Sequence, residues 1–296
     1  MTHVITMNPP SLPRRVFDNR IVRFVVLFAA LIAVEVAAQI VPAKMMPLVP
    51  EPDRLTAAIA LSAASAVAIL LVYWVFVRAM EHRKVGELAP GKAPGGLIAG
   101  AAIGFGLFAL TMAVLYGLGV AQFHATPGNG LLRPANMAVL AAVGEELLMR
   151  GVIFRIFEEM FGSLVALVIS AALFGAAHLG NPGATLTSGV AIALEAGLLL
   201  AACYMWTRNL WLAIGLHFGW NFTEGALFGA AVSGNDFPGL YATTLHGPAQ
   251  LTGGAFGAEG SIVAVGVCLM AAMTFLILAM RRGQWRGLRL RINDRR

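Results

Sequence analysis

Residues 22–41 read VRFVVLFAALIAVEVAAQIV, a stretch in which only Arg23 and Glu35 carry charge. A helix needs about 20 mostly apolar residues to cross the hydrocarbon core of a bilayer. This stretch is long enough to do so. It follows three arginines and contains no short apolar region closed by a small-residue cleavage site, so we expect it to be retained as a first transmembrane helix.

The rest of the 296-residue chain has the same character. Apolar residues make up 58% of it and charged residues 12%, against roughly 45–50% and about 25% in soluble domains. We therefore predict an all-α, polytopic membrane protein with a single membrane domain over residues 1–296 and about eight transmembrane helices. The expected spans are 22–41, 56–77, 96–119, 135–157, 163–179, 187–206, 210–230 and 261–281.

The net charge of +6 comes largely from arginines in basic tails at 1–20 and 282–296. Because basic residues mark the cytoplasmic ends of spans, this pattern predicts that both termini are cytoplasmic, and it argues against nucleic-acid binding. Cys203 and Cys268 lie in separate apolar runs, so neither a disulfide framework nor a CxxC metal site is expected. The Ala-, Gly- and Arg-rich composition suggests a bacterial plasma (inner) membrane protein.

Glycines recur at four-residue spacing in two spans. Gly96, Gly100 and Gly104 lie in the third, and Gly215 and Gly219 in the seventh. This spacing lets helices approach closely, so we interpret these glycines as packing positions.

The segment 231–260 is glycine-rich and contains neither Lys nor Arg. The sequence leaves open whether this outer loop is a lid or a tether.

Ionisable side chains inside spans are the informative exceptions, because each costs about 2.5–3.5 kcal/mol on insertion scales. Such residues are functional candidates by default. They are Glu35, Glu145, Glu146, Arg150, His178, Glu195, His217 and Glu224, with Asn221 as a polar companion.

The fourth span carries the sequence EELLMR at residues 145–150. Glu146 and Arg150 are four residues apart and share a helix face, whereas Glu145 points about 100° away from Glu146. We predict that Arg150 neutralises one glutamate and leaves the other free to accept a proton. The alternative is that both glutamates only form ion pairs.

Two further motifs follow on later spans. Phe174 to His178 form an FxxxH motif, and His217 to Asn221 form HxxxN, with Glu224 on nearly the same face as His217. With a rise of about 1.5 Å per residue, these groups and Glu145 lie at depths that helix tilt can reconcile. We expect one polar chamber near mid-membrane, and a passive hydrogen-bond network is the alternative.

The three motifs, in this order on successive apolar helices, resemble the CAAX protease and bacteriocin-processing (CPBP, or Abi) family of intramembrane endopeptidases, which includes the type II CAAX prenyl endopeptidase. The resemblance covers 135–225, the expected catalytic core. It implies an eight-span helical fold and hydrolysis of a peptide bond in a membrane-associated protein or peptide. No position of the three motifs departs from the family pattern.

The resemblance also implies roles for individual residues. Glu145 would activate water together with His178, and Glu146 and Arg150 would support the site. His217 and Asn221 would stabilise the oxyanion. Phe174 would pack beneath His178.

The family resemblance leaves the cofactor open. Glu145, His178 and His217 would match a zinc site of two histidines and one glutamate, but the sequence lacks HExxH. We therefore expect no obligatory metal. The expected partners are a peptide or protein substrate and the bilayer, and the oligomeric state is open.

Two other functions stay as alternatives. A non-catalytic scaffold or immunity-type protein would use the polar cluster only for structure. A proton-coupled transporter would use the buried glutamates as a relay, although no internal repeat supports it.

Overall fold

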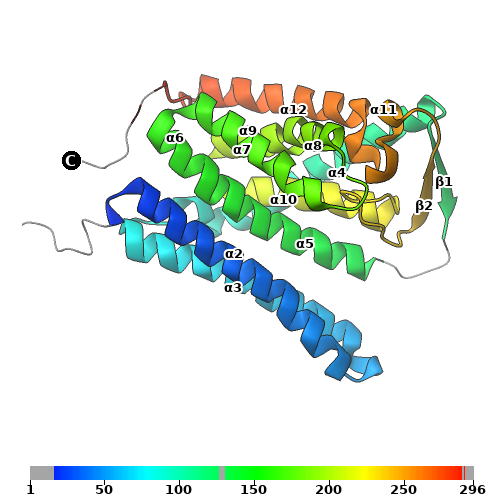
Figure 1. Cartoon of the computed structure of the whole chain (residues 1–296), viewed down its shortest axis with the longest axis horizontal. Helices are drawn as coiled ribbons and strands as arrows, with labels where there is room; N and C mark the ends of the chain where they lie inside the picture. The colour runs from blue at the N-terminus through cyan, green and yellow to red at the C-terminus, as the bar shows by residue number, and fades with distance from the viewer. Residues whose placement is uncertain (1–16, 127–130, 289, 291–296) are drawn as a thin grey trace, which may run out of the picture.

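The computed structural model describes residues 17–126, 131–288 and 290, and this part of the chain is almost entirely helical (Figure 1). The predicted all-α class is confirmed. The helices are α2 (Arg20–Met45), α3 (Arg54–Glu81), α4 (Ala93–Gly117), α5 (Leu132–Glu146), α6 (Arg155–Phe161), α7 (Ser163–Ala177), α8 (Leu186–Ile192), α9 (Leu198–Thr207), α10 (Leu210–Phe222), α11 (Ala249–Thr252) and α12 (Ile262–Arg281). Two short antiparallel strands, β1 (Ala121–Ala125) and β2 (Tyr241–Leu245), pair at one end of the molecule (Figure 1).

Six helical segments of the described residues are long and apolar enough to cross a membrane. They are Arg20–Leu48, Glu51–Glu81, Pro90–Gly117, Ser163–Gly180, Leu186–Thr207 and Ile262–Arg281. The other two expected spans, 135–157 and 210–230, do form helices at the expected places, but they carry the polar motifs and are not among the six. The protein is a polytopic membrane protein, while the count of eight spans and the cytoplasmic termini stay predictions.

Three π-helical turns interrupt the helices that carry these motifs or pack on them. Leu147–Phe154 joins α5 to α6, Ala193–Gly197 joins α8 to α9, and Thr223–Leu227 follows α10. Each π turn inserts an extra residue into the helix and re-aims the side chains and carbonyls around it, and such turns are frequent at functional sites. The sequence did not predict them.

Helices α4 and α10 pack at backbone contact through the spaced glycines. A Cβ atom added at Gly100 would lie 2.3 Å from the Leu212 carbonyl oxygen, and one at Gly104 would lie 2.1 Å from that of Leu216. On α10, Gly215 and Gly219 face the backbone of α4 equally closely. The predicted packing role of these glycines is confirmed. It fixes the helix that carries His217 and Asn221.

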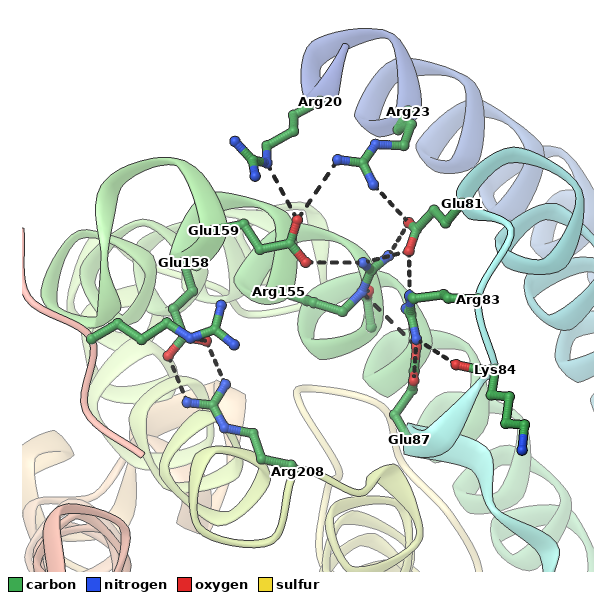
Figure 2. Close-up of polar contacts among 12 residues, drawn as sticks. Arg20, Arg23, Glu81, Arg83, Lys84, Glu87, Arg155, Glu158, Glu159 and Arg208 are labelled. Atoms are coloured by element: carbon green, nitrogen blue, oxygen red, sulfur yellow. Dashed lines mark hydrogen bonds and ion pairs between the residues drawn. The ribbon is translucent and has the colours of Figure 1, made fainter. Parts of the chain in front are cut away.

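Helices α2 and α3 pack side by side along one flank of the bundle, and they extend toward the lower right of Figure 1. At the other end of the pair, a cluster of ion pairs joins both helices to α6 (Figure 2). Arg155 of α6 donates to both oxygens of Glu81, at 2.7 and 2.9 Å. Arg20 and Arg23 of α2 contact Glu159, at 3.5 and 3.7 Å.

The cluster continues into the segment after α3. Arg83 donates to Glu87 at 2.7 and 2.8 Å, and Tyr73 donates to the same carboxylate at 2.6 Å. Burial would raise the pKa of Glu87, but the hydrogen bonds from Arg83 and Tyr73 and the charges of Arg155 and Arg83 outweigh it and lower that pKa to about 2.

A second group of contacts joins α6 to the C-terminal segment. Glu158 accepts from Arg208 and from the Ser163 hydroxyl, and it lies 3.6 Å from Arg286. Arg208 also donates to the Gln284 side chain. The start of the predicted C-terminal tail is therefore docked on the bundle. Residues 1–16, 289 and 291–296 of the predicted basic tails lie outside the described residues.

The outer loop 231–260 is folded against the bundle. It contains β2, α11 and two short helical turns, and Phe256 within it is 1% exposed. Ser233, Asn235 and Glu259 of this loop line a cavity described below. The loop thus packs against the helices and contributes to the wall of the cavity.

Candidate active site

The site is built on the junction between α5 and the π turn that follows it. Glu145 and Glu146 end α5, and Arg150 lies within the π turn. Arg150 Nη1 donates to Glu146 Oε1 at 2.8 Å, and both side chains are fully buried. This is the pair that the four-residue spacing predicts. Glu145 lies outside it, with 34% of its side chain exposed.

The second terminal nitrogen of Arg150 fixes the pair to the neighbouring helix. Nη2 donates to the carbonyl oxygens of Ala196 and Gly197, at 2.9 and 3.3 Å. Both carbonyls belong to the π turn between α8 and α9. The Arg150 guanidinium also lies over the ring of Phe174, 4.7 Å from its centroid, a geometry that favours a cation–π attraction.

The ring of Phe174 packs against the rings of both histidines. Its ring centroid lies 4.8 Å from that of His178 and 6.2 Å from that of His217, the latter edge to face. The ring is 2% exposed. Phe174 therefore packs against His178, as the resemblance implied.

His217 of α10 connects the two glutamates. Its Nδ1 lies 3.0 Å from Glu146 Oε1, and its Nε2 lies 3.9 Å from Glu145 Oε2. Because Glu146 is paired with Arg150 and offers acceptor oxygens, Nδ1 is the nitrogen that carries hydrogen. Glu146 thereby fixes the orientation of the imidazole, and Nε2 is turned toward Glu145.

His178 ends α7, and its own helix sets its tautomer. Its Nδ1 lies 2.8 Å from the carbonyl oxygen of Phe174. A carbonyl only accepts, so Nδ1 donates, and in the neutral ring Nε2 keeps its lone pair. His178 is partly exposed and lines the cavity. It can therefore accept a proton or a hydrogen bond there.

A cavity of about 470 Å³ brings the motifs together. Glu145, His178, His217 and Asn221 all line it. The predicted common chamber is present. Glu146 and Arg150 do not line it and lie behind its wall, while Glu224 is fully buried away from the cavity lining.

The outer loop contributes a residue that the sequence did not point to. Glu259 lines the cavity and accepts hydrogen bonds from Trp220 Nε1 at 3.0 Å and from the backbone and hydroxyl of Ser233 at 2.8 Å. The only signal available was that Glu259 is one of two acidic residues, with Asp236, in a glycine-rich loop without Lys or Arg. Its contact with Trp220 ties the loop to α10.

The geometry gives no support to a zinc site made by Glu145, His178 and His217. Within the described residues, no group of three or more His, Cys, Asp or Glu side chains is placed to hold a metal ion. The Nδ1 atoms of both histidines are engaged by other groups, and His217 Nε2 is 3.9 Å from Glu145. The expectation that no metal is obligatory stays a prediction.

Comparison with known proteins agrees with the motifs. Residues 127–223 match the family described as Type II CAAX prenyl endopeptidase Rce1-like. No curated protein and no solved structure matches the chain. The match confirms the family resemblance, and its members are peptidases. All six candidate site residues, from Glu145 to Asn221, lie inside the matched segment.

Proposed function

We propose that this chain, a membrane peptidase of the Rce1-like family, is an intramembrane endopeptidase that uses a glutamate-activated water. The observation that supports the proposal best is the cavity itself. One carboxylate free of Arg150, two histidines and a carboxamide line the same 470 Å³ space. The substrate is a peptide or protein at the membrane.

In the first step, water lies between Glu145 and Nε2 of His178. Glu145 takes a proton from the water, and the oxygen of the water attacks the carbonyl carbon of the scissile bond. The C=O electron pair moves to the oxygen and forms a tetrahedral oxyanion. Because His178 Nδ1 donates to the Phe174 carbonyl, its Nε2 can orient the water as a hydrogen-bond acceptor.

The oxyanion then needs hydrogen-bond donors on the side away from Glu145 and His178. The Asn221 carboxamide supplies an N–H, and His217 supplies one from Nε2 when the ring is an imidazolium, a form that carboxylates on both sides stabilise electrostatically. Collapse of the intermediate breaks the C–N bond, and the proton held by Glu145 passes to the leaving amine. Atoms and charge balance without a metal ion.

Glu146 and Arg150 act as positioning residues. They touch neither water nor substrate in this scheme, since both are fully buried behind the cavity wall. Their contacts hold His217 on one side and the π turn of Ala193–Gly197 on the other. We propose no obligatory metal, and we place both termini in the cytoplasm of a bacterial cell.

The test is cleavage of a single-span reporter protein by purified enzyme in liposomes. Glu145→Gln and His178→Ala should each lower kcat/KM by about 100–10,000-fold. Glu51→Gln is the control, because Glu51 is 84% exposed in the turn before α3. Unchanged cleavage by both site variants would overturn the proposal, and full cellular function of Glu145→Gln would favour a scaffold.

A further inference from the structure

The wall of the cavity is acidic beyond what the proposed chemistry requires. Among the described residues that line it are four glutamates, and none is Lys or Arg; the glutamates are Glu35, Glu145, Glu195 and Glu259. The nearest buried arginine, Arg150, is already paired with Glu146 behind the wall. The chemistry uses Glu145 alone, so the other three need a separate account.

Glu35 lies beside the catalytic carboxylate although it comes from a different helix. It is on α2, and its carboxyl packs on the backbone of α5 at Gly144, the residue before Glu145. A Cβ atom added at Gly144 would lie 3.1 Å from Glu35 Oε1 and 3.2 Å from Glu35 Cδ. A larger residue at this position would crowd the Glu35 carboxyl.

The carboxyl of Glu35 is held there without a protein partner. Its Oε1 atom is buried and has no hydrogen-bond partner among the described residues. One turn further along α2, Gln39 also lines the cavity. Glu35 and Gln39 thus form a polar strip on a helix that is apolar elsewhere between Arg23 and Lys44.

A second glutamate of the cavity wall has the same property. Glu195 is 1% exposed, lines the cavity, and its Oε2 atom has no hydrogen-bond partner in the described part of the chain. Glu259 differs, because Trp220 and Ser233 satisfy it. The cavity wall therefore contains buried carboxyl oxygens without a hydrogen-bond partner among the described residues, one on Glu35 and one on Glu195.

Buried carboxylate oxygens without donors are costly, and a donor or cation brought by a ligand relieves that cost. A ligand that carries its own carboxylate would meet these oxygens with no Lys or Arg in the described lining to offset the repulsion. The surroundings of the scissile bond thus complement a cationic nitrogen and oppose an anionic group.

We propose that Glu35 is a substrate-binding residue that receives the ammonium or guanidinium group of a Lys or Arg side chain next to the scissile bond. The inference rests on the proposed peptidase function and narrows its substrate class. Glu35 lies outside the matched segment 127–223. The family match therefore does not include it.

The cleavage point of a single-span reporter protein is mapped first. The test then uses three versions of this reporter that carry Lys, Gln or Glu at the residue beside the cleavage point and are otherwise identical. With wild-type enzyme in liposomes, kcat/KM should be about tenfold higher for Lys than for Gln, and lowest for Glu. Glu35→Gln should bring the Lys-to-Gln ratio close to one. Glu35→Lys should reverse the preference in favour of the Glu reporter, and the control Glu51→Gln should keep the wild-type ratio.

A binding measurement separates this inference from the proposed function. Non-cleavable Lys and Gln versions of the reporter peptide are titrated onto the same liposomes. Preferred binding of the Lys peptide that disappears in Glu35→Gln supports the inference even if no reporter is cleaved, a result that would overturn only the peptidase proposal. Equal binding, or a Lys-to-Gln ratio that stays the same in both Glu35 variants, would overturn the inference.

Discussion

Two regions of the molecule contain buried glutamates, and they differ in whether those glutamates pair with arginines. In the cluster at the start of α2 and α6 (Figure 2), Glu81, Glu87, Glu158 and Glu159 each lie within 4.0 Å of at least one arginine. In the cavity, Glu35, Glu145 and Glu195 have no such partner in the described residues. The paired charges fasten helices together, and the unpaired ones remain available to water and substrate.

The ion pair of Glu146 and Arg150 belongs to the first kind although it lies next to the second. It is buried as deeply as any contact in the molecule and holds the site in place. Variants that remove a charge from the cluster or from this pair should therefore lower the stability of the protein. Variants that remove a charge from the cavity should lower its activity.

The largest effect is expected for Arg150→Met. It leaves Glu146 buried without its cation and removes the donor to the Ala196 and Gly197 carbonyls. Loss of one partner of a buried ion pair destabilises by about 3–5 kcal/mol, and we expect cleavage to be lost as well. Thermal unfolding in detergent measures the first effect. The double variant Glu146→Met, Arg150→Met should recover stability but not cleavage, and a double variant no more stable than Arg150→Met would contradict this account.

Asn221→Ala should show the opposite profile. The side chain lines the cavity and is proposed to donate to the oxyanion. Loss of one such donor lowers kcat by about 100–1,000-fold, while the unfolding temperature should change little. A kcat loss without a matching rise in KM sharpens the distinction between the two regions. A large drop in unfolding temperature would instead assign Asn221 to the structural group.

The cluster predicts a stability loss in acid. The pKa of Glu87 is about 2 in the folded protein, below its ordinary value of 4.5. A carboxyl group whose pKa is lower in the folded protein stabilises the fold at pH values above its ordinary pKa. This contribution of up to about 3 kcal/mol is lost as the pH falls from 4.5 toward 2. Unfolding temperatures across this range should fall less steeply in Glu87→Gln than in wild type. Parallel curves would show that Glu87 is not the group responsible.

The smallest effect is expected for Arg208→Met. Glu158 loses one arginine but keeps the Ser163 hydroxyl and Arg286. We expect a destabilisation of about 1–3 kcal/mol, undocking of the segment that contains Gln284, and cleavage within a few-fold of wild type. Limited proteolysis after residue 281 reports the undocking. If Arg208→Met lost cleavage to the same extent as Asn221→Ala, the assignment of stability to the cluster and of activity to the cavity would be wrong.

Local spacing explains which features were predictable. The pairing of Glu146 with Arg150 depends on a four-residue interval, and the contact of α4 with α10 depends on regularly spaced glycines. Both patterns can be recognised within one helix. The shared chamber followed because four polar side chains in apolar spans have few alternatives to facing one another.

Features that depend on distant segments were missed. The partners of Glu81 include residues on α2 and α6, and Glu259 reaches Trp220 from a loop. Nothing in a local window specifies such pairs. The π turns likewise depend on tertiary contacts, such as the Arg150 contact with the Ala196 carbonyl. The contact of Glu35 with Gly144 needed the packing of α2 against α5.

The glycine contact between α4 and α10 limits how the enzyme can admit a substrate. Rotation or sliding of α10 would drive the Cα atoms of Gly100 and Gly104 into carbonyl oxygens that already lie against them. His217 and Asn221 thus lie on a helix that is held in place against α4. Widening of the cavity is therefore expected from the other elements that line it, and these include α2, which carries Glu35, and the outer loop.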